Sequence, residues 1–416
     1  MKKIYSGKGK NLTVIGGGAA GVFCAVNVAR LNPSVQVTLL EKTNKLLSKV
    51  RISGGGRCNV THACFDIPEM INKYPRGANF LKRTFYHFFT IDTIRWFEER
   101  GVRLKTEADG RMFPVTDSSQ TIIDCLMKEV NIHHVEIMMN AEVKRIIQQN
   151  ELFEIELTGA RQISTDSICV ACGGYNKSVA FDWIRQVGHT IEDPVPSLFT
   201  FNMPDHPIRE LMGIVLPAAQ VKIPGTKLSE KGPVLVTHWG LSGPTILRLS
   251  AWGAKELAAR NYHFSITVNW LGNLNEADIR IMFTELRSEL ASQKILNNNS
   301  FGLPQRFWQF LCSQSGITEN IRWADLPAKT QNQLIRNLAA YELMVKGKTT
   351  FKEEFVTAGG IHLNEIDPNT MQSKIVPNLF FAGEVMNVDG ITGGFNFQHA
   401  WTSGWIAATA ISKLGN

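Results

Sequence analysis

A βαβ unit over residues 11–41 constrains the fold of this chain more than any other feature. The segment NLTVIGGGAAG gives an apolar strand and a glycine turn, a helix of small residues follows, and VQVTLLE is a second strand that ends in Glu41. Gly16 permits the tight turn, Gly18 lets a pyrophosphate approach the backbone, and Gly21 lets helix and sheet pack closely. Glu41 stands where an acid binds ribose hydroxyls. The unit predicts a dinucleotide-binding domain.

Composition places the chain among globular proteins with more than one domain. Its 416 residues exceed a single comfortable core, and 44% of them are hydrophobic. The start MKKIYSGKGK leads into a strand without an apolar signal segment, and no apolar run is long enough to span a bilayer. Seven scattered cysteines make no disulfide framework, and no spacing of His, Cys and carboxylates is typical of a metal site. We therefore expect a cytoplasmic protein without metal or membrane partner.

Positive charge is concentrated in the first quarter of the chain. The formal charge is +7, but residues 1–110 carry 18 Lys and Arg against 8 Asp and Glu. Such an excess is consistent with a polyanionic partner such as a nucleic acid. The phosphates of a dinucleotide and ordinary solvated faces are an equally good explanation, so charge alone leaves both open.

Local patterns predict the elements that follow the βαβ unit. Residues 42–57 hold five basic residues and the glycines 54–56, which exclude a regular helix and suit a loop pressed against a planar ligand or its phosphates. Further along we expect a helix over 79–100, a turn and a helix over 110–126, a hairpin over 141–159 and a buried strand over 167–176 beside the first strand.

The middle of the chain changes character and the end returns to the βα pattern. Short β-like pieces broken by Pro and Gly run to about residue 270, and helix-period segments dominate the next seventy residues. The end gives a strand at 378–382, a glycine-rich loop and a long helix. We predict an α/β protein with a discontinuous Rossmann-type domain that is formed by both termini, residues 1–195 and 346–416. Between these two parts we expect a β-rich insert over residues 196–273 and a small helical subdomain over residues 274–345.

The strand at 378–382 is followed by a second candidate binding loop. Glu384, in Phe-Ala-Gly-Glu, can accept hydrogen bonds from ribitol hydroxyls while backbone amides meet phosphate. Residues 389–396 then open a helix whose positive N-terminal end favours negative charge on the pyrimidine side of a reduced flavin.

Six short signatures, in order along the chain, carry a family resemblance: GGGAAG, ISGGGRCN, GRMFPV, THWGLSGP, VTAGGI and FAGEVMNVDGITGGFN. With them the chain resembles the BaiN/RdsA family of NAD(P)/FAD-dependent oxidoreductases, the YhiN-like flavoproteins, over nearly its whole length. The resemblance implies bound FAD and reduction of a conjugated C=C bond, either of uridine in large-subunit ribosomal RNA or of steroid-like enones such as dehydro bile acids. One position departs from the family pattern: Thr61 is followed by His62, where we expect asparagine. The role of the turn at residues 61–62 is therefore open.

Expected contacts to FAD come from both ends of the chain. They are Gly16, Gly18, Ala19, Ala20, Gly21, Glu41, Lys42, Gly55, Gly56, Arg57, Val143, Gly173, Gly383, Glu384, Asp389, Gly393, Gly394, Phe395 and Asn396.

Reduction of a conjugated double bond needs hydride from flavin N5 and a proton donor beside the acceptor carbon. Cys58, next to Arg57 after the glycine loop, and His238, before Trp239 in the insert, are candidate donors. The alternative for Cys58 is a buried structural cysteine, which is usually inert. Arg57 is a candidate for polarising a substrate carbonyl, with a phosphate or carboxylate partner as the alternative. No second glycine fingerprint follows, so we expect either that NAD(P)H binds transiently or that another reductant serves.

Three functions remain open, and the basic first quarter favours uridine of ribosomal RNA as the substrate. A base must be unstacked and held before it can be reduced. Reduction of a small enone is the first alternative, and a flavin-loaded RNA-binding or assembly factor is the second. Basic and aromatic residues are candidates for holding RNA: Lys73, Tyr74, Arg76, Phe80, Lys82, Arg83, Phe85 and Tyr86. The alternative explanation of the same residues is an amphipathic helix whose aromatic side chains pack in the core. The sequence does not decide between NADH and NADPH, the modified nucleotide or the oligomeric state.

Overall fold

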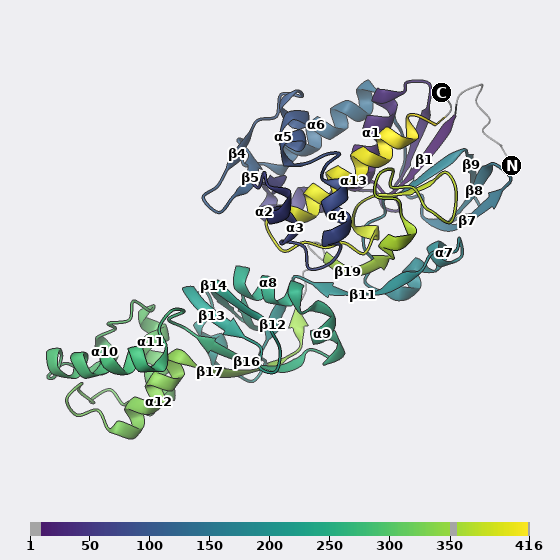
Figure 1. The fold of residues 1–416 in the computed structure, drawn as a ribbon. Coiled ribbons are helices and arrows are strands. Elements are labelled where there is room, and N and C mark those ends of the chain that lie inside the picture. Colours follow the sequence, from purple (N-terminus) through teal and green to yellow (C-terminus); the bar gives the residue numbers. More distant parts are fainter. Residues whose placement is uncertain (1–9, 350–355, 415–416) are drawn as a thin grey trace. The chain divides into compact units, whose positions relative to one another are not determined.

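A computed structural model describes residues 10–349 and 356–414 of the chain. The chain divides into two units, and each is described by itself. Unit 1 consists of Met1–Pro196 and Phe351–Asn416, and unit 2 of Ser197–Thr350, as far as these ranges are described. Segments from both ends of the chain therefore share one unit, as the purple and yellow elements in Figure 1 show.

A five-stranded parallel sheet forms the centre of unit 1. Its order is β20 (Leu379–Phe381), β10 (Ser167–Val170), β1 (Asn11–Ile15), β2 (Gln36–Leu40) and β6 (Glu136–Met138). The strands are short apolar runs, which is typical of parallel strands that are covered on both faces. The carboxyl ends of these strands form the edge where ligands bind in open α/β sheets.

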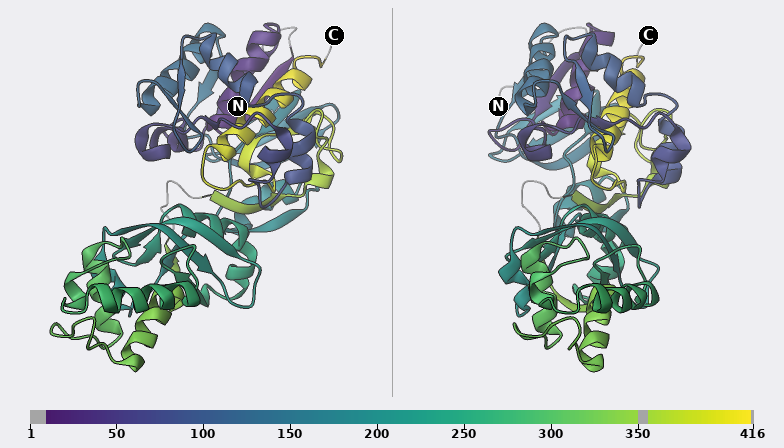
Figure 2. Two further views of the ribbon diagram at one scale, coloured as in Figure 1. Left: turned by 60° about the vertical axis from the view of Figure 1, so that its left-hand side comes forward. Right: turned by 90° about the vertical axis from the view of Figure 1, so that its left-hand side faces the viewer.

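Helices from the two ends of the chain pack against each other in unit 1. α1 (Ala19–Leu31) and α13 (Phe395–Ile411) run side by side in Figures 1 and 2. Both are rich in small residues and buried over most of their surface, so their backbones approach closely. The other helical elements of unit 1 are α2 (Ser48–Gly56), α3 (Ile67–Ile71), α4 (Ala78–Thr84), α5 (Thr90–Glu98), α6 (Ser119–Ile132), α7 (Asp182–Arg185) and three 3₁₀ turns, Ser178–Phe181, Leu363–Glu365 and Gly383–Val385.

Smaller sheets complete unit 1. β7 (Val143–Gln149) and β8 (Leu152–Leu157) form the predicted hairpin, and β9 (Gln162–Thr165) joins them. The other strands are β3 (Thr61–His62), β5 (Arg111–Pro114) and β4 (Leu104–Thr106) in one sheet, and β11 (Ile191–Ser197) with β19 (Val356–Ile361) in another.

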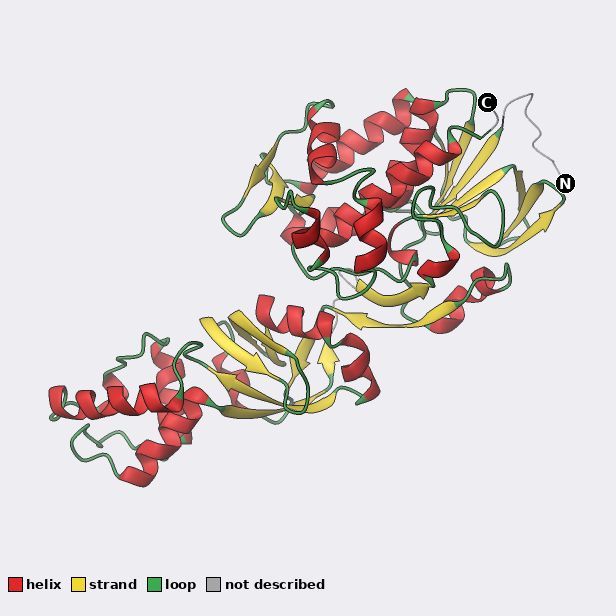
Figure 3. Cartoon of the chain, viewed as in Figure 1, coloured by secondary structure: helices red, strands yellow, loops and turns green. Residues whose placement is uncertain are grey.

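Unit 2 combines a seven-stranded sheet with helices, which Figure 3 shows in yellow and red. Its strands, in sheet order, are β17 (Tyr341–Lys346), β16 (His263–Asn269), β13 (Val215–Lys222), β14 (Ser229–Thr237), β15 (Gly240–Ser242), β12 (Thr200–Asn202) and β18 (Lys348–Thr349). Its helices are α8 (Pro244–Trp252), α9 (Ala254–Ala259), α10 (Glu276–Glu289), α11 (Gln305–Gln314) and α12 (Ala328–Ala339), with 3₁₀ turns at Pro207–Leu211 and Ile295–Asn297.

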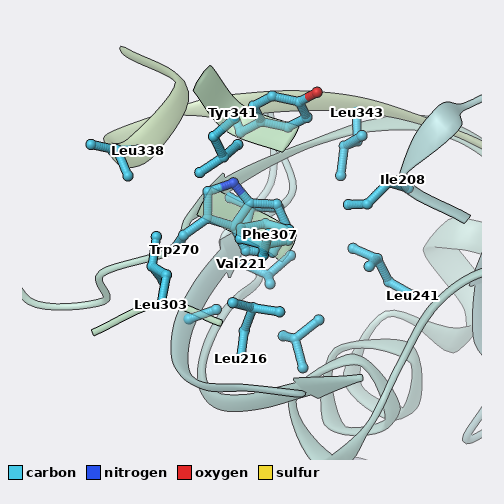
Figure 4. Close-up of a cluster of buried hydrophobic side chains, with 14 of the residues drawn as sticks. Ile208, Leu216, Val221, Leu241, Trp270, Leu303, Phe307, Leu338, Tyr341 and Leu343 are labelled. Atoms are coloured by element: carbon cyan, nitrogen blue, oxygen red, sulfur yellow. The ribbon is translucent and has the colours of Figure 1, made fainter. Parts of the chain in front are cut away.

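The helices α10–α12 share one hydrophobic core with the sheet. Figure 4 shows Trp270 and Phe307 among side chains from the strands and from α12, including Leu216, Leu338 and Tyr341. Phe307 of α11 is fully buried, and its ring centroid lies 4.7 Å from that of Trp270. The helical part of the insert is therefore continuous with the β-rich part.

The helix predicted over residues 79–100 is wrong, because α4 and α5 are separated by a turn. The carboxylate of Asp92 accepts the Phe89 N–H (2.8 Å) and so begins a new helix there. The break also lets Phe85, Phe88 and Phe89 all be buried, which a single helix with one apolar face does not allow.

Other local differences have equally simple causes. α2 is interrupted as expected of its glycines, with Ser53 extended and Gly54 and Gly55 left-handed. Residues 341–346 form a strand, because Tyr341, Leu343 and Val345 alternate with exposed residues and pair with β16. The helices α8 and α9 were not predicted. No helix of the described ranges is long and apolar enough to cross a membrane.

The shared core predicts that unit 2 unfolds as one cooperative body. Phe307→Ala removes a buried ring, so we expect it to lower the free energy of unfolding of unit 2 by about 3–5 kcal/mol. Hydrogen exchange measured by mass spectrometry should accelerate in both α11 and β16. Ile281→Ala, at a side chain of α10 that is 61% exposed, is the control and should change little. Faster exchange confined to α10–α12 would contradict a common core.

Candidate functional site

The turn between β1 and α1 has space only for glycine at two positions. A Cβ on Gly16, whose φ is +114°, would lie 2.4 Å from the Ala171 carbonyl oxygen, and a Cβ on Gly21 would lie 1.9 Å from the Gly16 oxygen. Gly18 is different, because a Cβ there would have no atom within 4 Å. Gly18 caps α1, whose first turn contains no acidic residue and no side-chain cap. Open space and unpaired N–H groups at a helix N-terminus suit a phosphate group.

Glu41 is held next to this turn at the end of β2. Its Oε2 accepts the Gly17 N–H (2.9 Å), and its Oε1 accepts the N–H and the hydroxyl of Thr43 (both 2.8 Å). A carboxylate has about four acceptor positions, so Glu41 retains capacity for ribose hydroxyls. Lys42 follows, with its ammonium 5.2 Å from the ring centroid of Tyr175.

Residues from three other strands lie at the same edge of the sheet. Gly173, after β10, has φ +75° and no atom within 4 Å of the position of a Cβ. Val143 begins β7 and is half-buried, and the nearby Ala141 N–H donates to the Glu41 carbonyl (2.8 Å). Gly383 follows β20, and a Cβ there would lie 2.8 Å from that of Ala20, the second residue of α1, next to Ala19.

Glu384 carries a charge that the protein itself partly compensates. Its Oε1 accepts the Thr357 N–H (2.9 Å), and its Oε2 lies 2.5 Å from the ammonium of Lys49. The hydroxyl of Thr357 is buried and has no hydrogen-bond partner among the residues that the structure describes, and it lies 2.4 Å from where a Cβ of Gly174 would lie. A buried hydroxyl without a partner indicates a place for a ligand hydroxyl or oxygen.

The loop before α13 is fixed by its own side chains. Asp389 is fully buried and forms an ion pair with Arg76. The amide of Asn396 accepts the Gly390 N–H (2.8 Å) and donates to the Gly390 carbonyl (3.0 Å). These polar side chains thus stabilise the loop instead of projecting from it, and α13 begins after Gly394 without an acid in its first turn.

Arg57 and Cys58 lie in a tightly built part of the site. The Arg57 guanidinium lies 2.5 Å from the Glu107 carboxylate and 4.0 Å from the ring centroid of Phe113. Cys58 is fully buried, and burial raises the pKa of its thiol to about 12. Such a buried thiol has the properties of a structural cysteine, so Cys58 is a poor candidate for the proton donor.

The neighbouring glycines are more open than Arg57 and Cys58. A Cβ on Gly55 or Gly56 would have no atom within 4 Å, so there is space beside the backbone at these two positions.

His238 belongs to unit 2, in the turn between β14 and β15. Its side chain is exposed and its ring centroid lies 3.5 Å from that of Trp239. Its carbonyl accepts a hydrogen bond from the Arg209 guanidinium (2.6 Å). An exposed imidazole beside an indole remains a candidate proton donor.

The segment 59–62 clamps the start of α13, which the sequence did not predict. Hydrogen bonds join the two: Gly394 N–H to the Asn59 amide oxygen (2.9 Å), Thr61 hydroxyl to Gln398 (2.6 Å), Trp401 indole N–H to the Val60 carbonyl (2.9 Å), and His62 Nδ1 with the Gly393 carbonyl (2.9 Å). The only signal in the sequence was the departure from the family pattern at His62.

His399 of α13 was also missed. Its Nε2 contacts the Gly383 carbonyl (3.2 Å), while Nδ1 is buried without a partner among the described residues. Burial lowers the pKa of His399 to about 4. The imidazole is therefore neutral under ordinary conditions and helps to fix the Gly383 turn.

Most of the candidate residues for holding RNA are buried or paired, so the structure favours the alternative explanation, core packing, for them. Phe80 and Phe85 belong to the core, the buried Tyr74 hydroxyl donates to the Phe395 carbonyl (2.7 Å), and Arg76 pairs with Asp389. The exposed members of the set are Lys82, Arg83 and Tyr86, whose side chain is 73% exposed.

The residues at this edge of the sheet fit FAD. Open positions at Gly18, Gly55 and Gly173 leave room for a ligand against the backbone, and the buried Thr357 hydroxyl has no partner within the described part of the chain. Helix N-termini without acids, at α1 and α13, suit its negative groups. Among the described residues, no group of three or more His, Cys, Asp and Glu side chains could hold a metal ion.

Comparison with known proteins agrees with this arrangement. The family model for the HI0933-like protein Rossmann domain matches residues 10–410. The chain is 28% identical to the ribosomal RNA dihydrouridine synthase of Escherichia coli (strain K12), over 95% of this chain and 96% of that protein. It is 27% identical to the 3-dehydro-bile acid delta(4,6)-reductase of Clostridium scindens, over 96% and 98%.

A solved structure shows the same fold at low sequence identity. The 3-ketosteroid-delta4-(5alpha)-dehydrogenase of Rhodococcus jostii RHA1 aligns with a TM-score of 0.51 at 11% identity, covering 97% of this chain and 98% of that protein.

Gly18→Asp should separate folding from cofactor binding. An aspartate is a good helix N-cap and has space here, so the stability of the apoprotein should stay within about 0.5 kcal/mol. Its carboxylate repels the diphosphate, and we expect FAD affinity to fall by roughly a hundredfold, or about 2.8 kcal/mol. Fluorescence titration of FAD and urea unfolding measure the two effects. Gly18→Ser is the uncharged control, and FAD binding by Gly18→Asp at the original affinity would exclude this phosphate site.

His399 should make unit 1 sensitive to acid. Because the folded-state pKa lies below the usual 6.5, the unfolded chain takes up the proton first, and stability falls as pH decreases from about 6.5 towards 4. The loss is about 3 kcal/mol at pH 4. Urea unfolding of the apoprotein at pH 7 and 4.5 should therefore show a smaller difference for His399→Gln than for the original chain. Equal differences would mean that His399 titrates normally.

Proposed function

The chain is a FAD-dependent oxidoreductase of the HI0933-like Rossmann domain family, and we propose that it reduces the C5=C6 bond of a uridine in large-subunit ribosomal RNA to dihydrouridine. NAD(P)H is the proposed reductant. The uracil C5=C6 bond is conjugated to the C4 carbonyl, so hydride addition at C6 and protonation at C5 is a conjugate reduction.

The exposed basic and aromatic side chains of α4 and of the turn after it are the observation that favours RNA as the substrate. Lys82 and Arg83 are exposed, and the structure gives neither an ion pair with the described residues. Tyr86 lies one helical turn beyond Lys82 and exposes most of its ring. Cations near an exposed aromatic ring suit the backbone and bases of an unpaired strand. The relative from Escherichia coli, which is named for this reaction, gives independent support.

Bound FAD would supply the hydride, and the residues of this chain would hold it and the substrate. The N-termini of α1 and α13 meet negative charge, and Glu41, Glu384 and the Thr357 hydroxyl accept or donate hydrogen bonds to sugar and ribitol hydroxyls. The positive charge of Arg57 is partly neutralised by its ion pair with Glu107, so Arg57 would polarise a substrate carbonyl less strongly. His238 is the remaining proposed proton donor.

Reduction of a small-molecule enone is the second candidate. The relative from Clostridium scindens, named for a dehydro bile acid, is matched at nearly the same identity and coverage as the RNA enzyme. Its substrate carries the same conjugated C=C–C=O group, so a shared cradle serves either reaction, and the substrate is decided by surfaces outside the cradle.

Mass spectrometry of ribosomal RNA tests the proposal directly. In a strain that lacks this protein, one uridine of the large-subunit RNA should lose a mass increment of two hydrogens, and the wild-type chain should restore it. The His238→Gln chain should restore it slowly if His238 donates the proton. Ribosomal RNA that is identical with and without the protein, together with rapid oxidation of the reduced enzyme by an enone, would favour the second candidate.

The double substitution Lys82→Gln with Arg83→Gln should weaken RNA binding without changing FAD binding. Removal of two phosphate contacts should reduce the magnitude of the slope of log affinity against log salt concentration by about 1.4–1.8. Binding to a fragment of large-subunit RNA, followed by anisotropy at several salt concentrations, measures this slope. Lys222→Gln with Lys227→Gln removes the same charge from exposed positions of unit 2 and is the control. An equal change in both double variants would mean that only net charge matters.

A further inference from the structure

His62 lies against the turn that leads into α13. Its Nδ1 is 2.9 Å from the Gly393 carbonyl oxygen, so Nδ1 carries a hydrogen and donates it. Its ring stacks on Phe395, with centroids 4.6 Å apart and an interplanar angle of 27°. The hydrogen bond fixes the tautomer, because a backbone carbonyl can only accept. The stacking fixes the plane of the ring, because Phe395 is held as the first residue of α13.

The second ring nitrogen, Nε2, is free to gain a proton. A Cβ on Gly110 would lie 2.5 Å from Nε2, so the ring packs against backbone that leaves room for it only because residue 110 is glycine. No hydrogen bond to Nε2 is formed within the described ranges. In the neutral tautomer Nε2 is an acceptor, and its protonation leaves the bond from Nδ1 to Gly393 intact. Charge at this position can therefore change without breaking the clamp.

The surroundings keep the imidazole neutral until negative charge arrives. Burial is the main cause that lowers the pKa of His62; the nearby ammonium of Lys73 lowers it further, and the Gly393 carbonyl and the carboxylates of Asp109 and Glu69 oppose the shift. A new negative charge near the turn would raise this pKa. The α13 N-terminus has no acid in its first turn, so it favours negative charge, and we expect the charge of a reduced cofactor to lie there.

We propose that His62 is a positioning residue for FAD, which holds the Gly393–Gly394 turn at the start of α13 and takes up a proton from water when the flavin is reduced. A dihydronicotinamide or dithionite supplies two electrons, the flavin gains one proton at N5 and remains negatively charged at N1, and a second proton passes from water to Nε2 of His62. The inference rests on the FAD site and is independent of the substrate that the enzyme reduces.

The holoenzyme reduced with dithionite, without RNA or enone, tests the proposal. His62→Asn keeps an N–H donor for the Gly393 carbonyl and removes the titrating base. We expect its affinity for oxidised FAD to change less than threefold. Below the pKa of His62 its preference for reduced over oxidised FAD should fall by up to about tenfold for each unit by which reduction raises that pKa, the loss should be smaller at pH 6, and at pH 8 the preference should match that of the original chain. The flavin midpoint potential of the original protein should accordingly depend more steeply on pH.

Controls separate proton uptake from a structural effect. His87→Asn replaces an exposed histidine of unit 1 and should leave the midpoint potential unchanged at every pH. His62→Gln offers a second neutral side chain should asparagine disturb the fold. The same pH dependence in His62→Asn as in the original chain would overturn the proposal, and so would an equal loss of affinity for oxidised and reduced FAD. A chain that binds no FAD at all would instead remove the cofactor assignment itself.

Discussion

The pairing of β20 with β10 is the constraint on which the site depends. This parallel ladder aligns Ile168 with Leu379 and Val170 with Phe381, although more than 200 residues separate the two strands in the chain. Because parallel strands end at a common edge, the ladder brings Gly383 and Glu384 beside the glycine turn of β1 and α1. Half of the candidate site thus exists only after the chain has returned from unit 2.

α13 secures this arrangement by binding both backbone groups of one residue. The Ser403 hydroxyl accepts the Gly383 N–H (2.9 Å), and Nε2 of His399, one turn earlier in α13, contacts the Gly383 carbonyl (3.2 Å). With φ +74° Gly383 adopts a conformation that few other residues tolerate. The buried polar side chains of a mostly apolar helix therefore have a specific purpose: they fix the turn that presents Glu384.

Local chemistry explains which features could be predicted from the sequence. The cradle at Gly16–Glu41, the β7–β8 hairpin and the closing helix depend on neighbours within about thirty residues, and their patterns are complete in the sequence. Burial of Cys58 and the clamp from His62 to Gly393 depend on contacts between residues more than 300 positions apart or on packing around the glycine loop. The aromatic residues near 80–89 illustrate the same limit in another way. Their pattern favours core packing, and the structure buries Phe85, Phe88 and Phe89, but the break between α4 and α5 that lets all of them be buried could not be predicted from the sequence.

The motif Arg-Cys-Asn-Val-Thr-His acquires a different meaning from these contacts. The thiol of Cys58, the side chain of the motif with the greatest intrinsic reactivity, is fully buried. Asn59, Thr61 and His62 form hydrogen bonds to the start of α13. The motif therefore fixes the start of α13, beside the proposed cofactor site. Relatives named for ribosomal RNA and for a bile acid match the chain at nearly the same identity, so overall identity does not separate the two substrates. We propose that exposed surfaces such as that of Lys82, Arg83 and Tyr86 make the distinction.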